Sequence, residues 1–227
     1  MRSCCDFMIG ESSAMAFRIL VADDHPLMRA ALHQAVGQAL PGAEIVEAAR
    51  FEEVEQALSH GAGFDTVLLD LHMPGMNGLI GLVLLRSEYP ATPVIVVSAQ
   101  EDGTTIQRAM DYGASGFVPK SAPITQIGEA IRAVLDGAIW VPAAESPPQA
   151  DEADLATRVA GLTPQQLRVL AGIAEGKLNK QIAYEMGVVE TTVKAHVTVI
   201  LRRLGVHSRT QAALVASRLA LAPQAEG

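Results

Sequence analysis

Cysteine is almost absent from this chain. Of its 227 residues only Cys4 and Cys5 are cysteines, and they are neighbours near the N-terminus. Adjacent cysteines rarely bridge each other and no third cysteine can pair with them, which excludes a disulfide framework. We therefore expect a cytoplasmic protein rather than a secreted, disulfide-rich one.

Long apolar runs are also missing, and aromatic residues make up only 4% of the chain. No run approaches the roughly 18 residues that span a bilayer, so we expect no membrane partner. The segment Met1–Ala16 lacks the compact apolar block of a secretion signal. We interpret residues 1–16 as a disordered leader, with Met15 as an alternative start.

The two ends of the chain differ in charge. Residues 1–154 hold 8 Lys and Arg against 21 Asp and Glu, a net charge of −13, whereas residues 155–227 hold 9 against 4, a net charge of +5. This asymmetry predicts two domains with different partners, and the basic one is suited to a polyanion.

From Phe17 onward, short apolar segments alternate with longer stretches of helical periodicity. The predicted strands are Arg18–Ala22, Glu44–Glu47, Thr66–Leu69, Val94–Val97 and Gly116–Val118. The predicted helices are Pro26–Leu40, Phe51–His60, Leu79–Glu88, Thr105–Tyr112 and Ile124–Leu135. Five strand–helix repeats predict a doubly wound (βα)5 parallel sheet covered by helices on both faces.

The pattern changes after this first domain, which we assign to residues 17–138. Residues 139–158 are predicted to be a linker, because Ala143–Asp154 is rich in Pro, Ala and acidic residues without periodicity. Residues 159–222 are predicted to form an all-α domain of four helices. Two of them are joined by a turn at Gly187, which is the helix-turn-helix pattern.

Polar side chains follow the predicted strands of the first domain. They are Asp23, Asp24, Asp70, Ser98 and Lys120. Because ligands of an open parallel sheet bind beyond the carboxyl ends of its strands, we expect these groups to converge. Three clustered carboxylates require a cation, and Mg²⁺ prefers oxygen ligands. Asp70 is then the natural nucleophile toward a phosphoryl group, since Asp23 and Asp24 are needed as ligands.

Taken singly, these residues have plainer interpretations. Asp24 precedes His25-Pro26 and can cap a helix, and Asp70 can begin a turn that ends at Pro74-Gly75. It is their joint placement at the ends of the right strands that favours a phosphoryl-transfer site.

Several motifs of the first domain resemble a response-regulator receiver over about residues 17–138. They are Val21-Ala22-Asp23-Asp24-His25-Pro26, Leu68-Leu69-Asp70-Leu71-His72-Met73-Pro74-Gly75-Met76-Asn77-Gly78, Val97-Ser98-Ala99 and Gly116-Phe117-Val118-Pro119-Lys120. The resemblance implies that Asp70 accepts phosphate from a sensor histidine kinase. The implied Mg²⁺ ligands are Asp23, Asp24, Asp70 and the backbone carbonyl of His72.

The resemblance also implies a switch in which Ser98 turns toward the phosphate and Phe117 changes rotamer, beside Lys120. Phe117 retains the plainer interpretation of an ordinary core residue. His72 and Gln100 stand two residues beyond Asp70 and Ser98. We hypothesise that these two side chains set the lifetime of the phosphate by screening it from attacking water.

The second domain resembles a LuxR-type helix-turn-helix over about residues 159–221. The motifs are Leu162-Thr163, Gly176, Asn179-Lys180-Gln181-Ile182-Ala183, Thr192-Val193-Lys194-Ala195-His196 and Ser208-Arg209-Thr210-Gln211-Ala212. Receiver and helix-turn-helix together resemble NarL/FixJ-type regulators. The implied function is a transcription factor that a kinase controls through Asp70.

The predicted recognition helix, from about Glu190 to Leu204, has a small, polar and basic outward stripe suited to a major groove. The predicted DNA-binding residues are Lys180, Thr191, Thr192, Lys194, Ala195, Thr198, Arg202 and Arg209. Of these, Lys180, Thr192 and Arg209 are expected on phosphates. The plainer interpretation of this stripe is a solvated helix face.

Two positions depart from the LuxR-type pattern. Val189 stands where Ser or Thr usually precedes the recognition helix, and the loss of a capping side chain costs about 1 kcal/mol of helix stability. Leu178 likewise replaces a small hydroxyl residue.

A single module offers few base contacts, so we expect a homodimer on double-stranded promoter DNA, with Ala213, Leu214 and Ala216 as a dimer surface. We also expect the acidic first domain to shield the basic second domain until the second domain is released. One alternative is DNA binding without a phosphoswitch, with the receiver used for protein interaction. Another is a phosphoaspartyl phosphatase, for which His72 is the only weak acid–base candidate. We expect a regulator and not an enzyme.

Overall fold

The computed structural model of the protein describes residues 16–60, 63–142 and 150–220. All but Ala16 of the predicted leader, and residues 143–149 of the predicted linker, lie outside the described residues. None of the described helices has the length and apolarity that a bilayer span requires.

The first domain is built on one parallel sheet of five strands. The strands are β1 (Arg18–Ala22), β2 (Glu44–Ala48), β3 (Thr66–Asp70), β4 (Val94–Ser98) and β5 (Gly116–Pro119). Their order across the sheet is β2-β1-β3-β4-β5, and every pairing is parallel. Strands β3 and β4 are buried along their whole length, as their uninterrupted apolar sequences require.

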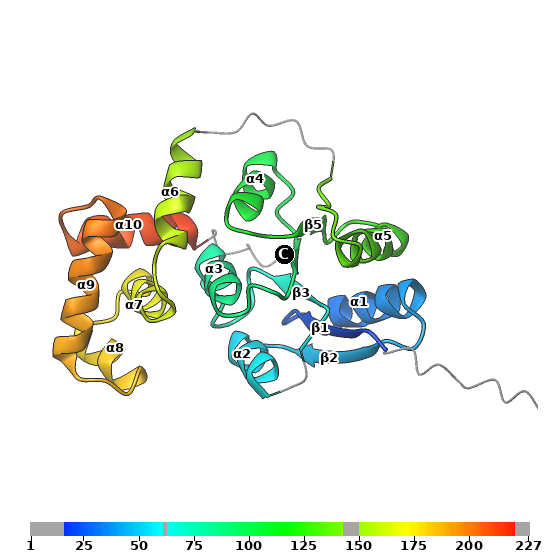
Figure 1. The fold of residues 1–227 in the computed structure, drawn as a ribbon, viewed down its shortest axis with the longest axis horizontal. Helices are drawn as coiled ribbons and strands as arrows, with labels where there is room; N and C mark the ends of the chain where they lie inside the picture. The colour runs from blue at the N-terminus through cyan, green and yellow to red at the C-terminus, as the bar shows by residue number, and fades with distance from the viewer. Residues whose placement is uncertain (1–15, 61–62, 143–149, 221–227) are drawn as a thin grey trace, which may run out of the picture.

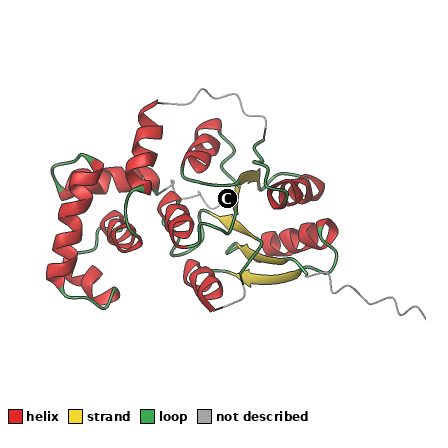
Figure 2. Ribbon diagram, viewed as in Figure 1, coloured by secondary structure: helices red, strands yellow, loops and turns green. Residues whose placement is uncertain are grey.

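Helices cover both faces of this sheet (Figures 1 and 2). They are α1 (Pro26–Ala39), α2 (Phe51–His60), α3 (Leu79–Glu88), α4 (Gly103–Asp111) and α5 (Ile124–Leu135). Helices α1 and α5 pack on one face, while α2, α3 and α4 lie on the other. This architecture confirms the predicted fold class, and the predicted elements are present with ends shifted by one or two residues at most.

The second domain is entirely helical. Its elements are α6 (Ala150–Ala160), α7 (Pro164–Ala174), α8 (Asn179–Glu185), α9 (Glu190–Leu204) and α10 (Arg209–Leu219). A capping box starts α7, because the Thr163 hydroxyl accepts from Gln166 N and Gln166 Oε1 accepts from Thr163 N. Left-handed glycines end α8 and α9, at Gly187 (φ 64°) and Gly205 (φ 70°).

Helix α6 was not predicted, since residues 139–158 were expected to be a linker. The structure corrects this expectation from Ala150 onward. The buried positions Glu152, Ala156 and Val159 follow a helical spacing. This face was missed because it is built from a charged residue, a small one and a single large apolar one.

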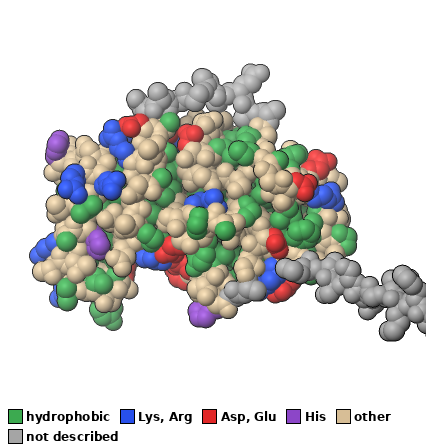
Figure 3. All heavy atoms as spheres, viewed as in Figure 1, with side chains coloured by type: hydrophobic (Ala, Val, Ile, Leu, Met, Phe, Trp, Pro, Cys, Tyr) green, Lys and Arg blue, Asp and Glu red, His purple; other side chains and the backbone are tan. Residues whose placement is uncertain are grey.

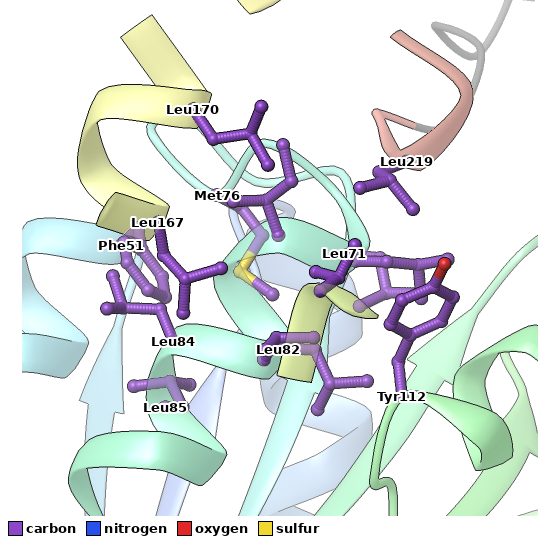
Figure 4. Close-up of a cluster of buried hydrophobic side chains, with 14 of the residues drawn as sticks. Phe51, Leu71, Met76, Leu82, Leu84, Leu85, Tyr112, Leu167, Leu170 and Leu219 are labelled. Carbon is purple, nitrogen blue, oxygen red and sulfur yellow. The ribbon is translucent and has the colours of Figure 1, made fainter. Parts of the chain in front are cut away.

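The two domains share an apolar core. Helix α3 is apolar around its whole circumference, and Leu79 to Leu85 are all buried. One side of α3 faces the sheet, and the other is covered by α7 and α10 (Figure 1). Figure 4 shows Leu167 and Leu170 of α7 and Leu219 of α10 against side chains of the first domain that include Leu84 and Tyr112.

Candidate phosphoacceptor site and DNA-binding face

The predicted acidic pocket is assembled at the carboxyl edge of the sheet. Asp70 ends the buried strand β3, Asp23 follows β1, and both carboxylates are inaccessible to solvent. Lys120, just beyond β5, places its Nζ 2.7 Å from Asp23 Oδ2 and 2.9 Å from Asp70 Oδ2. The structure thus brings together charged groups from three separate strands, as the sequence predicts.

Burial and charge act in opposite directions on these carboxylates. Burial raises the pKa of Asp23 above its ordinary value, and Lys120 offsets only part of that effect. Burial also acts to raise the pKa of Asp70, but the His72 imidazole and Lys120 outweigh it and hold that pKa below its ordinary value. Contacts to both carboxylates raise the pKa of Lys120 despite its own burial. Asp70 is therefore ionised near neutral pH, as a nucleophile must be.

His72 and Ser98 flank Asp70. The His72 backbone N–H donates to Asp70 Oδ1 at 3.1 Å, and His72 Nδ1 lies 3.7 Å from the same oxygen. Ser98 ends β4, is fully buried, and its hydroxyl accepts from the backbone N–H of Gln100 at 3.1 Å. Phe117 is also fully buried, in the middle of β5.

The residues of this edge fit a hard divalent cation. Asp23, Asp24, His25 and Asp70 each offer one ligand atom, and these atoms lie within 4.8 Å of one another. Carboxylate oxygens dominate the set, which suits Mg²⁺ better than softer ions. His25 was not among the predicted ligands; its Nδ1 lies 2.6 Å from Asp24 Oδ1, and its position directly after Asp24 was the available signal.

The predicted recognition stripe lies on the outside of α9. Thr191, Lys194, Ala195, Thr198 and Arg202 are all exposed, and Figure 1 places α9 on the side of its domain that faces away from the sheet. Lys and Arg side chains gather at this end of the molecule in Figure 3. The expected shielding of this face by the first domain is not observed, because the first domain contacts the second through α6, α7 and α10 instead.

The predicted phosphate-contacting residues differ in their surroundings. Lys180 on α8 is exposed, and Thr192 at the start of α9 is half-buried. Arg209 donates to Asn179 Oδ1 at 2.9 Å and to the backbone carbonyl of Lys177. Arg209 thus also holds the α7–α8 turn in place.

One contact between the domains could not be anticipated from the sequence. Asn77, in the loop after Asp70, donates to Glu175 at the end of α7 at 2.9 Å. Asn77 has a left-handed backbone (φ 53°), which Asn tolerates better than most residues. The loop between β3 and α3 therefore touches the second domain directly.

Comparison with known proteins agrees with this geometry. Residues 19–132 match the response regulator receiver domain, and residues 160–216 match the bacterial regulatory proteins of the luxR family. Together, the receiver fold and the LuxR-type domain define a DNA-binding two-component response regulator. The chain belongs to the NarL/FixJ type of this family.

Curated relatives match over nearly their whole length. The chain is 43% identical over 209 residues to the glycerol metabolism activator of Pseudomonas putida, covering 88% of this chain and 95% of that protein. It is 33% identical over 205 residues to the nitrate/nitrite response regulator protein NarP of Escherichia coli, covering 89% and 95%.

Among solved structures, the fold is similar to the RcsB response regulator of Salmonella typhimurium. The TM-score is 0.52 at 20% identity, and the match covers 89% of this chain and 99% of that one.

Proposed function

We propose that Asp70 accepts a phosphoryl group from a sensor histidine kinase, and that this modification controls binding to promoter DNA. The observation that carries the proposal is the ionised, fully buried Asp70 carboxylate paired with Lys120 at the edge of the sheet. An Asp70 oxygen forms the new bond to phosphorus as the bond between phosphorus and the donor histidine nitrogen breaks. Because the other ring nitrogen of the phosphohistidine carries a proton, the histidine leaves as the neutral imidazole.

Each neighbour has a proposed part in this transfer. Asp23, Asp24, Asp70 and the His72 carbonyl would hold Mg²⁺, which would offset the negative charge of the transferred oxygens. The Lys120 ammonium, already 2.9 Å from Asp70, would pair with one of those oxygens. Ser98 would rotate to donate to another, and Phe117 would occupy the space that it leaves.

The proposed DNA interface is the exposed face of α9. Thr191, Lys194, Ala195, Thr198 and Arg202 would enter the major groove, while Lys180, Thr192 and Arg209 would lie against phosphates. Two copies of the chain would bind neighbouring half-sites, which suits the few base contacts that one helix can make. In this proposal the protein acts in the cytoplasm as a regulator, with no catalytic activity on outside substrates.

The test is DNA binding with and without a phosphoryl analogue. Wild type, Asp70→Asn and the control Asp136→Asn, an exposed aspartate at the end of α5, are titrated onto genomic fragments. Each titration is run at one fixed salt concentration, with and without beryllofluoride plus Mg²⁺. We expect the analogue to tighten binding by wild type and Asp136→Asn and to leave Asp70→Asn unchanged.

Equal binding by all three proteins, whatever the analogue, would refute the phosphoswitch. The protein would then be a DNA-binding regulator whose receiver responds to a protein partner. Turnover of phosphoester substrates by the wild type would instead revive the phosphatase interpretation.

A further inference from the structure

A cleft of about 570 Å³ lies between the two domains. Helices α2 and α3 and the loop between β3 and α3 line one side of it, and α7, α8 and the turn before α9 line the other. Figure 3 shows the molecule hollowed between α8 and α2, with acidic and basic side chains gathered at the opening. A concave site of this volume at a domain interface is of the kind that binds small molecules.

The floor of the cleft is apolar. Met76 of the loop, Leu84 of α3 and Leu167 of α7 are buried there, and Figure 4 shows these side chains lying together. The apolar lining continues on the second domain with Ala171, Met186 and Val188. Two of these residues are methionines, whose flexible thioethers adapt to the shape of what they contact. The floor therefore suits the apolar body of a ligand.

The charged side chains of the cleft favour a cation. Four of them are glutamates and only two are basic, an arginine and a lysine, which leaves two net negative charges on the lining. The glutamates are Glu52, Glu55, Glu175 and Glu185. A cavity lined by one sign of charge over low-dielectric walls concentrates ligands of the opposite sign.

Both basic side chains of the cleft are already paired. The guanidinium of Arg168 lies 2.8 Å and 2.9 Å from two carboxylates of the first domain. Lys177 Nζ lies 2.6 Å from Glu175 and 2.6 Å from Glu185. An anionic ligand would have to displace these carboxylates, whereas each carboxylate can accept further hydrogen bonds from a cationic one.

Glu52 is the most accessible acceptor in the lining. It is exposed, and its ion pair with Arg50 is long, at 3.7 Å. Its carboxylate lies against Gly75 of the loop, where an added Cβ would stand only 2.6 Å from Glu52 Oε1. Glycine at this position thus leaves room for the carboxylate at the opening of the cleft.

We propose that this cleft is a binding site for a small amphipathic amine. Its ammonium group lies among the glutamates, where it donates to several oxygens, and its apolar body covers the floor and removes it from water. The ligand contacts the loop that follows Asp70 and the turn that precedes α9 at the same time. It therefore stabilises the docked arrangement of the two domains. The site is separate from the phosphoacceptor site and does not depend on modification of Asp70.

The test is a titration calorimetry series on the full chain with three probes that differ at one end only. They are 4-phenylbutylamine, which is protonated at neutral pH, the neutral 4-phenylbutanol and the anionic 4-phenylbutyrate. We expect the amine to bind with a dissociation constant of about 1 mM or lower. The alcohol should bind about tenfold more weakly and the carboxylate weaker still, and this difference should shrink as salt is added.

Single substitutions test the charged lining. Glu52→Gln and Glu185→Gln each remove one negative charge from an exposed side chain and should weaken binding of the amine about threefold. Binding of the alcohol should not change in either variant. The matched control is Glu129→Gln, an exposed glutamate on α5, which should bind all three probes as the wild type does.

Methyl NMR on methionine-labelled protein locates the bound amine without any substitution. The methyl signals of Met76 and Met186 should shift on titration, because both residues line the cleft. The signal of Met28, which packs on the opposite face of the sheet, should not.

Equal affinity for the amine and the alcohol would overturn the proposal, because the cleft would then be an apolar groove without a cation site. No binding of the amine at ten times the expected dissociation constant would also overturn it. So would wild-type affinity for the amine in both Glu52→Gln and Glu185→Gln, or a shift of Met28 without shifts of Met76 and Met186. All of these readouts are taken on the unmodified protein, so failure of the proposed phosphoswitch leaves them unaffected.

Discussion

The neighbours of Asp70 offset the effect that burial has on the pKa of its carboxyl. Burial acts to raise the pKa of the Asp70 carboxyl, and the His72 imidazole and Lys120 more than offset that effect. Asp23, equally buried, keeps a raised pKa because the same lysine does not fully offset its burial. The pKa values of the two carboxylates are therefore shifted in opposite directions, and the lowered pKa suits Asp70 as the nucleophile.

His72 and Gln100 are expected to set the lifetime of phosphorylated Asp70. His72 is only 10% exposed beside Asp70, and Gln100 is half-buried beside Ser98, so both narrow the approach of water. Replacing both by Ala should speed dephosphorylation about threefold or more, equivalent to lowering the barrier by about 0.7 kcal/mol. The rate is measured by loss of radiolabel from the phosphorylated protein.

The control for this measurement is His33→Ala, an exposed histidine on α1, which should leave the rate unchanged. An unchanged rate in the double variant would remove both residues from this role. A slower rate would show that they assist the attacking water instead.

At the residue scale, the sequence predicts what lies at strand ends and misses what pairs across domains. Asp23, Asp70 and Lys120 could be placed together because parallel strands end at one edge of their sheet. Arg108 and Glu152 could not, since they are 44 positions apart and lie on helices whose relative placement no periodicity reveals. Asn77 and Glu175, 98 positions apart, were missed for the same reason.

At the scale of single helices, the N-termini of the helix-turn-helix are unusual. The N-cap of α9 is Val189, which is extended (φ −82°, ψ 151°), 66% exposed and without a side-chain cap. The N-cap of α8 is Leu178, whose backbone N–H donates to Gln181 Oε1 at 2.7 Å. The leucine side chain has no oxygen that could accept from a backbone N–H of the first turn. Both helices are therefore held by packing rather than by capping.

Val189→Ser is expected to raise the free energy of unfolding by about 1 kcal/mol, because a serine in this extended conformation can cap α9. The opposite control is Ser208→Ala, which removes the hydroxyl that accepts from Gln211 N at 3.2 Å and should lower stability by a similar amount. Urea denaturation measures both. A loss of stability in Val189→Ser would mean that the valine side chain packs against a partner.

Three helices show how much of an element the sequence reveals. The capping box of α7 and the buried stripe of α9 at Val193, Ile200 and Leu204 were predictable, because local spacing encodes them. The all-round apolar character of α3 was visible in Leu79–Glu88, but its cause was not. Burial on both sides follows from the docking of α7 and α10, which local sequence does not specify.

On the scale of the whole molecule, the shared core predicts that the two domains unfold together. Polar contacts reinforce it, since Arg168 of α7 pairs with Glu55 of α2 at 2.8 Å and with Glu88 of α3 at 2.9 Å. These pairs are partly exposed and each contributes about 1 kcal/mol or less. Most of the coupling must therefore come from the apolar contacts beneath them.

Leu84→Ala tests that coupling, because Leu84 is 5% exposed on α3 and lies beside Leu167 of the other domain (Figure 4). A buried Leu→Ala substitution costs about 2–5 kcal/mol, and here part of that cost falls on contacts that exist only while the domains are docked. Calorimetry should show one transition for wild type and two for Leu84→Ala. Leu32→Ala, buried between α1 and the opposite face of the sheet, should lower the transition temperature without splitting it. Two transitions in the wild type would show that the domains unfold independently. One lowered transition in Leu84→Ala would show that the domains stay coupled without this contact.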